Sequence, residues 1–221
     1  ELAVAEKGLL WVAAEVRAAP GQGMLATRGS SAIARLAAFL GEVDALNEVR
    51  VAPPAEAGPL DAGEGGHGFR LSANLGTIRG GRFVSQVADS AMAEIDLRLP
   101  LGLNMAELEQ RLAVLAAAQP GLSLRRIKGW NPNETPLTSP IARAVADAAS
   151  AVRGRAPLPV VRLPASDASR WRALGVPAVC YGPQPTLASG VDDYAVAQDV
   201  IDCALVYAQA AWRYLTETSA Q

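Results

Sequence analysis

The order of periodic segments between Gly8 and Gly129 constrains the fold more than any other feature of this sequence. Apolar and polar residues alternate in several segments, as is typical of half-buried strands. The predicted strands are 8–17, 69–76, 91–99 and 122–128. Apolar residues recur at helical spacing after Ser30 and again after Asn104. The order strand, helix, strand, strand, helix, strand predicts a ferredoxin-like α+β domain with one antiparallel sheet and two helices on one of its faces.

The rest of the chain is too short to complete the kind of domain that its pattern predicts. A polar, proline-bearing linker leads to a helix that begins at Ser139, followed by candidate strands at 159–162 and 176–181. Parallel strands are normally covered on both faces, and two strands alone would leave apolar edges exposed. We therefore expect further strands from elsewhere. The predicted division is a ferredoxin-like domain over 1–130 and an incomplete α/β block over 131–221.

The helices have apolar sides that predict what each one buries. Ser166 can cap a short helix that ends at Gly175 and is expected to bury Trp171 and Leu174. The last helix is predicted from about Val196 to Leu215, with a buried side of Val200, Ile201, Ala204, Leu205, Ala208, Trp212 and Leu215. The buried stripe predicted for the helix after Ser30 is Ile33, Leu36, Ala37 and Leu40.

Composition limits the classes of function. The net charge is −2 and no basic run exists, which argues against nucleic acid and anionic membrane as partners. No apolar stretch could span a bilayer and no signal peptide is recognisable, so we expect a cytoplasmic protein with reduced core thiols at Cys180 and Cys203. Because the first residue is Glu1, we expect the sequence to begin partway through a longer polypeptide or to follow a removed tag. His67 is the only histidine, so a histidine-rich zinc centre cannot be assembled from this chain alone.

Two motifs near the end carry a family resemblance. Residues 166–183 (SDASRWRALGVPAVCYGP) and 188–194 (ASGVDDY) resemble the closing segment of the zinc-dependent amidohydrolases and exopeptidases that include acetylornithine deacetylase, succinyl-diaminopimelate desuccinylase and carboxypeptidase G. In that family a metal-binding histidine stands where this chain has Ser189. The resemblance implies a ferredoxin-like lid or dimerisation domain followed by the C-terminal part of the catalytic domain. The N-terminal catalytic part, which carries the other zinc ligands, is then absent from these residues.

The resemblance also identifies altered positions in the lid. A histidine that reaches the partner subunit's active site is replaced by Gln22, and the asparagine and proline of a Gly-Gly motif are replaced by Ser85 and Ala88. Gln22 could still donate a hydrogen bond to a substrate, although it cannot carry a proton. The alternative is that Gln22 is simply a solvated loop residue.

Two further residues are candidates for substrate binding. Arg98 aligns with a family arginine that binds a substrate carboxylate, and a guanidinium is well suited to a two-point contact with a carboxylate. Arg98 could equally pair with Glu94 or Asp96 on its own strand. Ser166 lies in a loop that hugs the substrate backbone in relatives, although the family's diglycine is missing here. Asp167 beside it is expected to help cap the following helix. The substrate-binding candidates are therefore Arg98, Ser166 and Gln22, and we predict no catalytic or metal-binding residue within this chain.

Three functional hypotheses follow from the sequence. The first is a catalytically degenerate family member that acts as a dimerising scaffold or partner subunit. The second is one half of a split zinc-dependent hydrolase of N-acyl amino acids or peptides, in which another chain supplies the N-terminal part and zinc is bound only when the site is completed. The third is a non-hydrolytic binder of a carboxylate-bearing small molecule. The expected assembly is a homodimer through the lid or a hetero-assembly with the completing chain.

Overall fold

The computed structural model describes residues 1–52, 60–183 and 191–218. Its contacts divide the chain into two compact units. The ferredoxin-like unit comprises 7–52 and 69–132, and the second unit comprises 1–6, 53–68 and 133–221. The sequence-based division at residue 130 instead groups 1–6 and 53–68 with the ferredoxin-like domain. The chain therefore passes back and forth between the units, which local patterns do not reveal.

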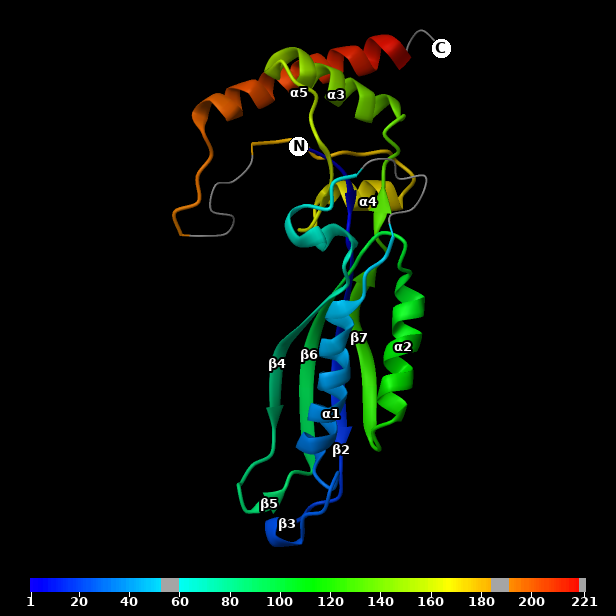
Figure 1. The fold of residues 1–221 in the computed structure, drawn as a ribbon, viewed down its shortest axis with the longest axis vertical. Coiled ribbons are helices and arrows are strands. Elements are labelled where there is room, and N and C mark those ends of the chain that lie inside the picture. The colour runs from blue at the N-terminus through cyan, green and yellow to red at the C-terminus, as the bar shows by residue number, and fades with distance from the viewer. Residues whose placement is uncertain (53–59, 184–190, 219–221) are drawn as a thin grey trace. The chain divides into compact units, whose positions relative to one another are not determined.

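The ferredoxin-like unit has the predicted α+β architecture. Its sheet has the order β4-β6-β2-β7 with antiparallel neighbours, and the helices α1 and α2 both contact it (Figure 1). The element bounds are β2 (Gly8–Arg17), α1 (Ala32–Asp44), β4 (Ser72–Gly80), β6 (Ser90–Leu99), α2 (Met105–Ala117) and β7 (Leu122–Trp130). The fold class predicted from the order of periodic segments is confirmed.

The core of this unit forms between the helices and one face of the sheet. Every second residue of β6 is buried, as the alternation predicts, and Leu108 and Leu112 of α2 are buried against the sheet. The stripe predicted for α1 is partly wrong, because Ile33 is 41% exposed. The residues that α1 buries are Ala32, Leu36, Phe39, Leu40 and Val43. The helix therefore presents Phe39 to the core, and its buried side is shifted relative to the predicted one.

A small ribbon extends one end of the ferredoxin-like unit. The strands β3 (Gly21–Gln22) and β5 (Gln86–Val87) pair antiparallel, and a 3-10 turn, η1 (Gly23–Leu25), follows β3. A second 3-10 turn, η2 (Ala45–Glu48), continues α1. The ribbon lies beyond the end of the four-stranded sheet (Figure 1).

The second unit is built around a strand that the sequence pattern did not predict. β1 (Leu2–Glu6) is wholly buried and lies between two partners, parallel to β9 (Pro159–Arg162) and antiparallel to β8 (Asn133–Glu134). The remaining elements are η4 (Glu64–Phe69), α3 (Pro140–Arg153), α4 (Asp167–Ala173) and α5 (Ala197–Thr218). Ser139 and Ser166 cap α3 and α4 through their side chains, as predicted for Ser166.

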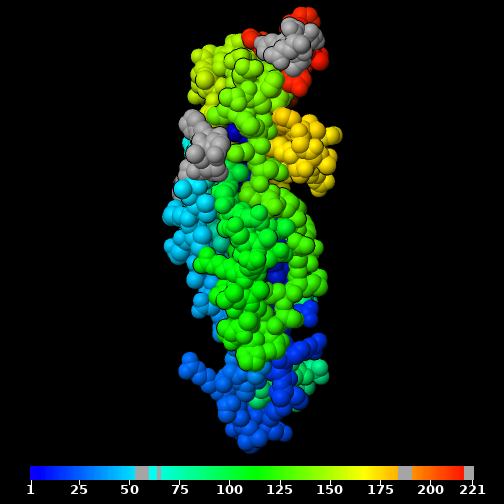
Figure 2. Space-filling view, turned by 90° about the vertical axis from the view of Figure 1, so that its right-hand side faces the viewer, coloured from blue at the N-terminus to red at the C-terminus, as the bar shows by residue number. Residues whose placement is uncertain are grey.

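Two predictions for this unit are wrong. Residues 176–181 do not form a strand, because they contribute only a bridge between Cys180 and Ala3, and the parallel partner of β9 is β1. The expected inner side of α4 is exposed, since Trp171 and Leu174 are 55% and 76% accessible. Figure 2 shows α4 at the surface of the molecule. The residues that α4 buries instead are Ala168, Ser169 and Arg172, the last of them for the electrostatic reason given below.

The buried side of α5 also differs from the prediction. Within this chain the helix packs on α3 through Cys203, Val206 and Ala210. The large side chains of the predicted face are instead at least half exposed: Val200, Ile201, Leu205, Trp212 and Leu215. None of the described helices combines the length and apolar character needed to cross a membrane.

Candidate functional site

A buried ion pair links the first strand of the second unit to α4. The carboxylate of Glu6 and the guanidinium of Arg172 are 3.1 Å apart, and their side chains are 1% and 2% exposed. Arg172 also donates from Nε to the Ala178 carbonyl at 3.0 Å and from Nη1 to the Asn133 side chain at 2.9 Å. Burial lowers the pKa of Arg172 and the charge of Glu6 opposes that shift, so the guanidinium stays charged. A charge pair buried this deeply is stable only because both members are hydrogen-bonded.

Ser166 belongs to the same buried network. Its backbone N–H donates to Glu6 Oε2 at 2.9 Å, and its hydroxyl donates to Glu6 Oε1. The hydroxyl also accepts from the Ala168 N–H, which caps α4, and lies 3.1 Å from the sulfur of Cys180. The hydroxyl thus serves internal contacts, as expected of a residue that ties α4 and Cys180 to the end of β1.

A second polar group lies on the ferredoxin-like unit around Arg98. Arg98 donates from Nε and Nη2 to the two oxygens of Asp96, at 2.8 and 2.9 Å, which is the pairing left open by the sequence. Lys7 is buried, and its ammonium donates to the Arg70 carbonyl at 2.6 Å. Burial first, and the charges of Arg98 and Arg70 second, lower the pKa of Lys7 from 10.5 to about 8, while Asp96 opposes the shift. The group has an excess of positive charge and could attract an anion.

The altered lid positions lie together at the ribbon end of the same unit. Gln22 lines a hollow of about 420 Å³ together with Arg82 and Ala88. The Gly23 N–H donates to the Ser85 carbonyl at 2.7 Å, so the substituted positions Gln22, Ser85 and Ala88 are neighbours. Gln22 itself is exposed. The resemblance therefore identified positions that the fold brings together, although their side chains no longer match the family.

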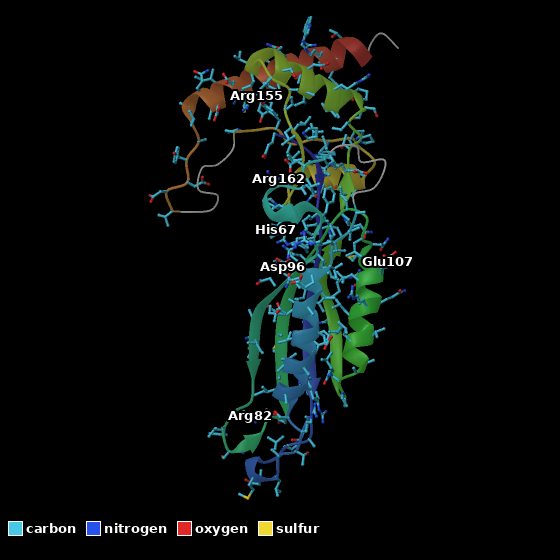
Figure 3. The ribbon with its side chains drawn as sticks, in the orientation of Figure 1. His67, Arg82, Asp96, Glu107, Arg155 and Arg162 are labelled. Carbon is cyan, nitrogen blue, oxygen red and sulfur yellow. The ribbon has the colours of Figure 1, made fainter. Side chains whose placement is uncertain are left out.

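The structure does not bring the three substrate-binding candidates together within one unit. Arg98 and Gln22 lie at opposite ends of the ferredoxin-like unit, as Figure 3 shows for Asp96 and Arg82, which neighbour them. A strand rises about 3.3 Å per residue, so the eight steps from Ser90 to Arg98 alone span about 26 Å. Ser166 belongs to the second unit. One small ligand cannot touch both Arg98 and Gln22 of the same copy.

The donors that the structure describes do not form a cluster that would fit a zinc ion. Among residues 1–52, 60–183 and 191–218, no three His, Cys, Asp or Glu side chains gather where they could hold a metal ion. Ser189, which aligns with the family's metal-binding histidine, lies outside these described residues. The buried carboxylate of Glu6 is committed to Arg172 and Ser166.

Comparison with known proteins identifies the family. Residues 4–121, more than half of the chain, match the model of the M20 peptidase dimerisation domain. The chain belongs to the M20 peptidase family. The suspected relationship to zinc-dependent amidohydrolases and exopeptidases is thereby confirmed, and the fold with its sheet and two helices is that of the M20 dimerisation domain. No curated protein sequence matches this M20 chain.

Solved structures support the fold over nearly the whole chain. An aminopeptidase PepT from Bacillus cereus has a TM-score of 0.73 and 15% identity, covering 97% of this chain and 54% of its own. A tripeptidase from Staphylococcus aureus has a TM-score of 0.69 and 14% identity, covering 100% and 54%. An M20 family metallo-carboxypeptidase from Sulfolobus solfataricus has a TM-score of 0.71 and 15% identity, covering 97% and 60%. This M20 chain thus spans about half the length of such neighbours.

Glu6, Arg172 and Lys7 are site residues that sequence reasoning missed. Glu6 and Arg172 are 166 positions apart, and no local periodicity links them. The available signal was the sequence LAVAE itself, in which one carboxylate ends an otherwise apolar strand. A charge in such a position needs a buried partner, which predicts that an arginine or lysine lies elsewhere in the fold.

Proposed function

We propose that this M20 chain is a cytoplasmic, catalytically degenerate subunit that acts by assembly and dimerises through its ferredoxin-like unit. The edge strand β4 carries the proposal. Seven of its nine residues, from Asn74 to Gly80, are exposed. Asn47 caps the start of this edge through both backbone groups of Ala73, so the part beyond Ala73 is the part available for pairing. An open edge strand readily pairs with another chain.

The charges of the two sheet edges favour β4 over β7. The other edge strand, β7, carries Arg125, Arg126 and Lys128, and a two-fold axis would bring these like charges together. The charge on β4 is limited to Arg79, and its Ile78 is 61% exposed. Ile33 on the neighbouring α1 is 41% exposed and contacts this end of β4 next to Gly80. Antiparallel pairing of two β4 strands would cover both isoleucines.

The oligomeric state tests this interface. Sedimentation equilibrium of the whole chain should give a dimer, and Ile78→Lys should shift it toward monomer by placing two like charges near the axis. Ile127→Lys on β7 is the matched control, because Ile127 is also partly exposed, and it should leave the dimer intact. A monomer at every concentration, or dissociation by Ile127→Lys but not by Ile78→Lys, would refute the proposed interface.

A second candidate function is binding of a carboxylate-bearing small molecule without hydrolysis. The excess of positive charge from Lys7, Arg70 and Arg98 around Asp96 favours it. A ligand carboxylate would have to compete with Asp96 for Arg98. N-acetyl amino acids should then raise the melting temperature, and Arg98→Ala should abolish the rise. If the rise persists in Arg98→Ala, this candidate is wrong. Gln22 could contribute only from another copy, and the internal hydrogen bonds of Ser166 support a structural role for it.

A third candidate is one half of a split zinc-dependent hydrolase of N-acyl amino acids or peptides. In this case another polypeptide would supply the zinc ligands, because the described donors of this chain do not gather into a site. Zinc content and amidase activity on N-acetyl amino acids, measured on the chain alone and with the completing polypeptide, separate this candidate from the scaffold. Bound zinc with activity in the complex supports a split enzyme. An assembled complex with neither supports the scaffold.

A further inference from the structure

Three arginines converge on one hollow of the ferredoxin-like unit. The hollow measures about 390 Å³ and lies where the four-stranded sheet leads into the ribbon, the end at which Figure 3 shows Arg82. We call it the arginine hollow. The residues that line it and carry the argument are Arg17 of β2, Arg79 of β4, Arg82 in the turn after β4, Glu15, Ser90 and Met92. Its volume is within the range of small-molecule sites.

The register of the sheet brings these residues to one face. Met92 of β6 is the Cα partner of Arg79 on β4 and of Glu15 on β2. Arg17 lies two residues after Glu15, and alternate residues of a strand point to the same face. Ala91, which precedes Met92 on β6, is buried in the core beneath the helices. The arginine hollow therefore opens on the face of the sheet that lacks helices, with Met92 between the two edges.

A glycine pair fixes the turn that carries two of the three arginines. A Cβ on Gly80 would lie 2.8 Å from the Cβ of Ala91, so glycine is needed for β4 to approach β6 this closely. Gly81 has a φ of +71°, and its N–H donates to the Ser90 carbonyl at 3.2 Å. The backbone on both sides of this glycine pair is thus held against β6, which gives the arginine side chains a defined base.

The charge of the arginine hollow is opposite to that of the whole chain. Three guanidinium groups share the hollow with one carboxylate, that of Glu15, which leaves a net charge of +2, whereas the chain carries −2. Within the described ranges none of the three arginines has an ion pair or a side-chain hydrogen bond, in contrast to Arg98. Asp89 lines the neighbouring hollow and accepts from the Ser90 hydroxyl at 3.1 Å. The guanidinium donors are therefore available to an external anion.

We propose that the arginine hollow binds a small phosphate compound, either a phosphate monoester or inorganic phosphate. At neutral pH a phosphate monoester carries about −1.5 to −2 charges and three acceptor oxygens, which match a net charge of +2 and the fork of donors on each guanidinium. A single carboxylate brings one charge and would leave part of the positive charge uncompensated. The absence of a basic run in the sequence favours a small molecule over a nucleic acid.

This site is separate from both groups used in the proposed functions. Every residue that lines the arginine hollow belongs to one copy of the ferredoxin-like unit, so the site does not depend on the β4 dimer. Arg98, the candidate for binding a substrate carboxylate, lies at the opposite end of β6 from Ser90. The inference therefore goes beyond the proposed function and adds a second kind of ligand.

Calorimetry on the whole chain tests the site. The probes are inorganic phosphate, glucose 6-phosphate, glucose and succinate, at about pH 7.5 and constant ionic strength, because general charge attraction changes with salt. Both phosphates should bind, glucose should not, and succinate should bind about tenfold more weakly or not at all. Arg17→Gln, Arg79→Gln and Arg82→Gln should each weaken phosphate binding about tenfold, since each removes charged hydrogen bonds.

Two further variants distinguish a site from a generally basic surface. Glu15→Gln should strengthen phosphate binding about twofold or more, because it removes the carboxylate that lines the hollow. Arg125→Gln is the matched control, because Arg125 is an exposed arginine of β7 outside the hollow, and it should leave binding within about twofold. Circular dichroism should be the same for all variants, since the substituted arginines are exposed.

The outcomes decide between the ligand classes. Phosphate binding that is lost in the three arginine variants and kept in Arg125→Gln supports the proposal. Tighter binding of glucose 6-phosphate identifies an ester as the ligand, and tighter binding of inorganic phosphate identifies the free anion. Absence of binding by the wild-type chain, or an equal loss in Arg125→Gln and Arg79→Gln, overturns the site. Succinate that binds as tightly as both phosphates overturns the assignment to phosphate.

Discussion

Replacing Arg172 with methionine should strongly destabilise the second unit. The substitution keeps a long apolar side chain on α4 but removes the charge that compensates Glu6, whose side chain is 1% exposed. Breaking a buried ion pair from one side typically costs about 3–5 kcal/mol. We expect the loss in free energy of unfolding to stay within this range, because Glu6 keeps its two hydrogen bonds from Ser166. The Ala178 carbonyl loses its bond from Arg172 but still accepts a hydrogen bond from the Thr135 hydroxyl.

A double-mutant cycle separates the ion pair from simple loss of packing. Glu6→Gln should also destabilise, because it leaves the Arg172 charge buried without its partner. The double variant, Glu6→Gln with Arg172→Met, should recover much of the loss, with a coupling on the order of 2 kcal/mol. Arg170→Met is the matched control on the same helix. Its side chain is 83% exposed, and it should change stability by less than about 0.5 kcal/mol.

The assay has to report on the second unit by itself. Urea unfolding followed by hydrogen exchange of peptides from β1 and α3 gives the midpoint for this unit, while peptides from β2 and β6 report the ferredoxin-like unit. We expect the urea midpoint of the second unit to be lower in Arg172→Met than in the wild-type chain. Similar midpoints for Arg172→Met and Arg170→Met would refute the reasoning, as would additive effects of Glu6→Gln and Arg172→Met.

Two further predictions concern the ferredoxin-like unit. The pKa of Lys7 is about 8 in the folded chain and 10.5 in the unfolded chain, so the unfolded chain binds more protons between these two pH values. The free energy of unfolding should therefore rise with pH across this window, by up to about 3 kcal/mol. Urea unfolding at several pH values measures this rise, and Lys7→Met should abolish it. Gly121→Ala should lower the free energy of unfolding by about 3 kcal/mol or more, because φ is +75° and the added Cβ would lie 2.2 Å from the Arg17 carbonyl oxygen. Gly29→Ala has a similar φ of +73° but open space around the added Cβ, so it should lower the free energy of unfolding by about 1 kcal/mol in the same urea assay. Equal costs for the two alanines, or a falling stability of wild type from pH 8 to 10, would contradict these arguments.

Local patterns were sufficient for the order of the main elements in the ferredoxin-like unit and insufficient for the second unit. Residues 91–99 alternate cleanly because the sheet in which they lie has helices on one face only, so burial follows sequence position. The β1 strand lacks that alternation because it is buried on both sides, and its parallel partner β9 is far away in the sequence. Short apolar runs of this kind cannot be assigned from periodicity alone.

Errors in the second unit have specific physical causes. Periodicity correctly identified an apolar side on α5, but periodicity does not reveal what covers that side. The side that the described chain covers is a different one, which contains Val206. At 176–181 an apolar run was interpreted as a strand, although Pro177 lacks an N–H, the Val176 N–H donates back to the Trp171 carbonyl, and Cys180 alone of the run bridges to a strand, at Ala3. For the site, the structure shows the pairing of Arg98 with Asp96, which the sequence left as the alternative to binding of a substrate carboxylate, and substrate binding by Arg98 stays a prediction.

The central position of β1 affects the order in which the protein can fold. Because translation proceeds at about 5–20 residues per second, Leu2–Glu6 must wait roughly 10–30 s until the β9 segment is synthesised. During that interval the ferredoxin-like unit has all of its own residues before its neighbour does. A nascent chain therefore carries an unpaired apolar strand with a lone carboxylate at its end, and this segment is where a ribosome-associated chaperone would be most useful.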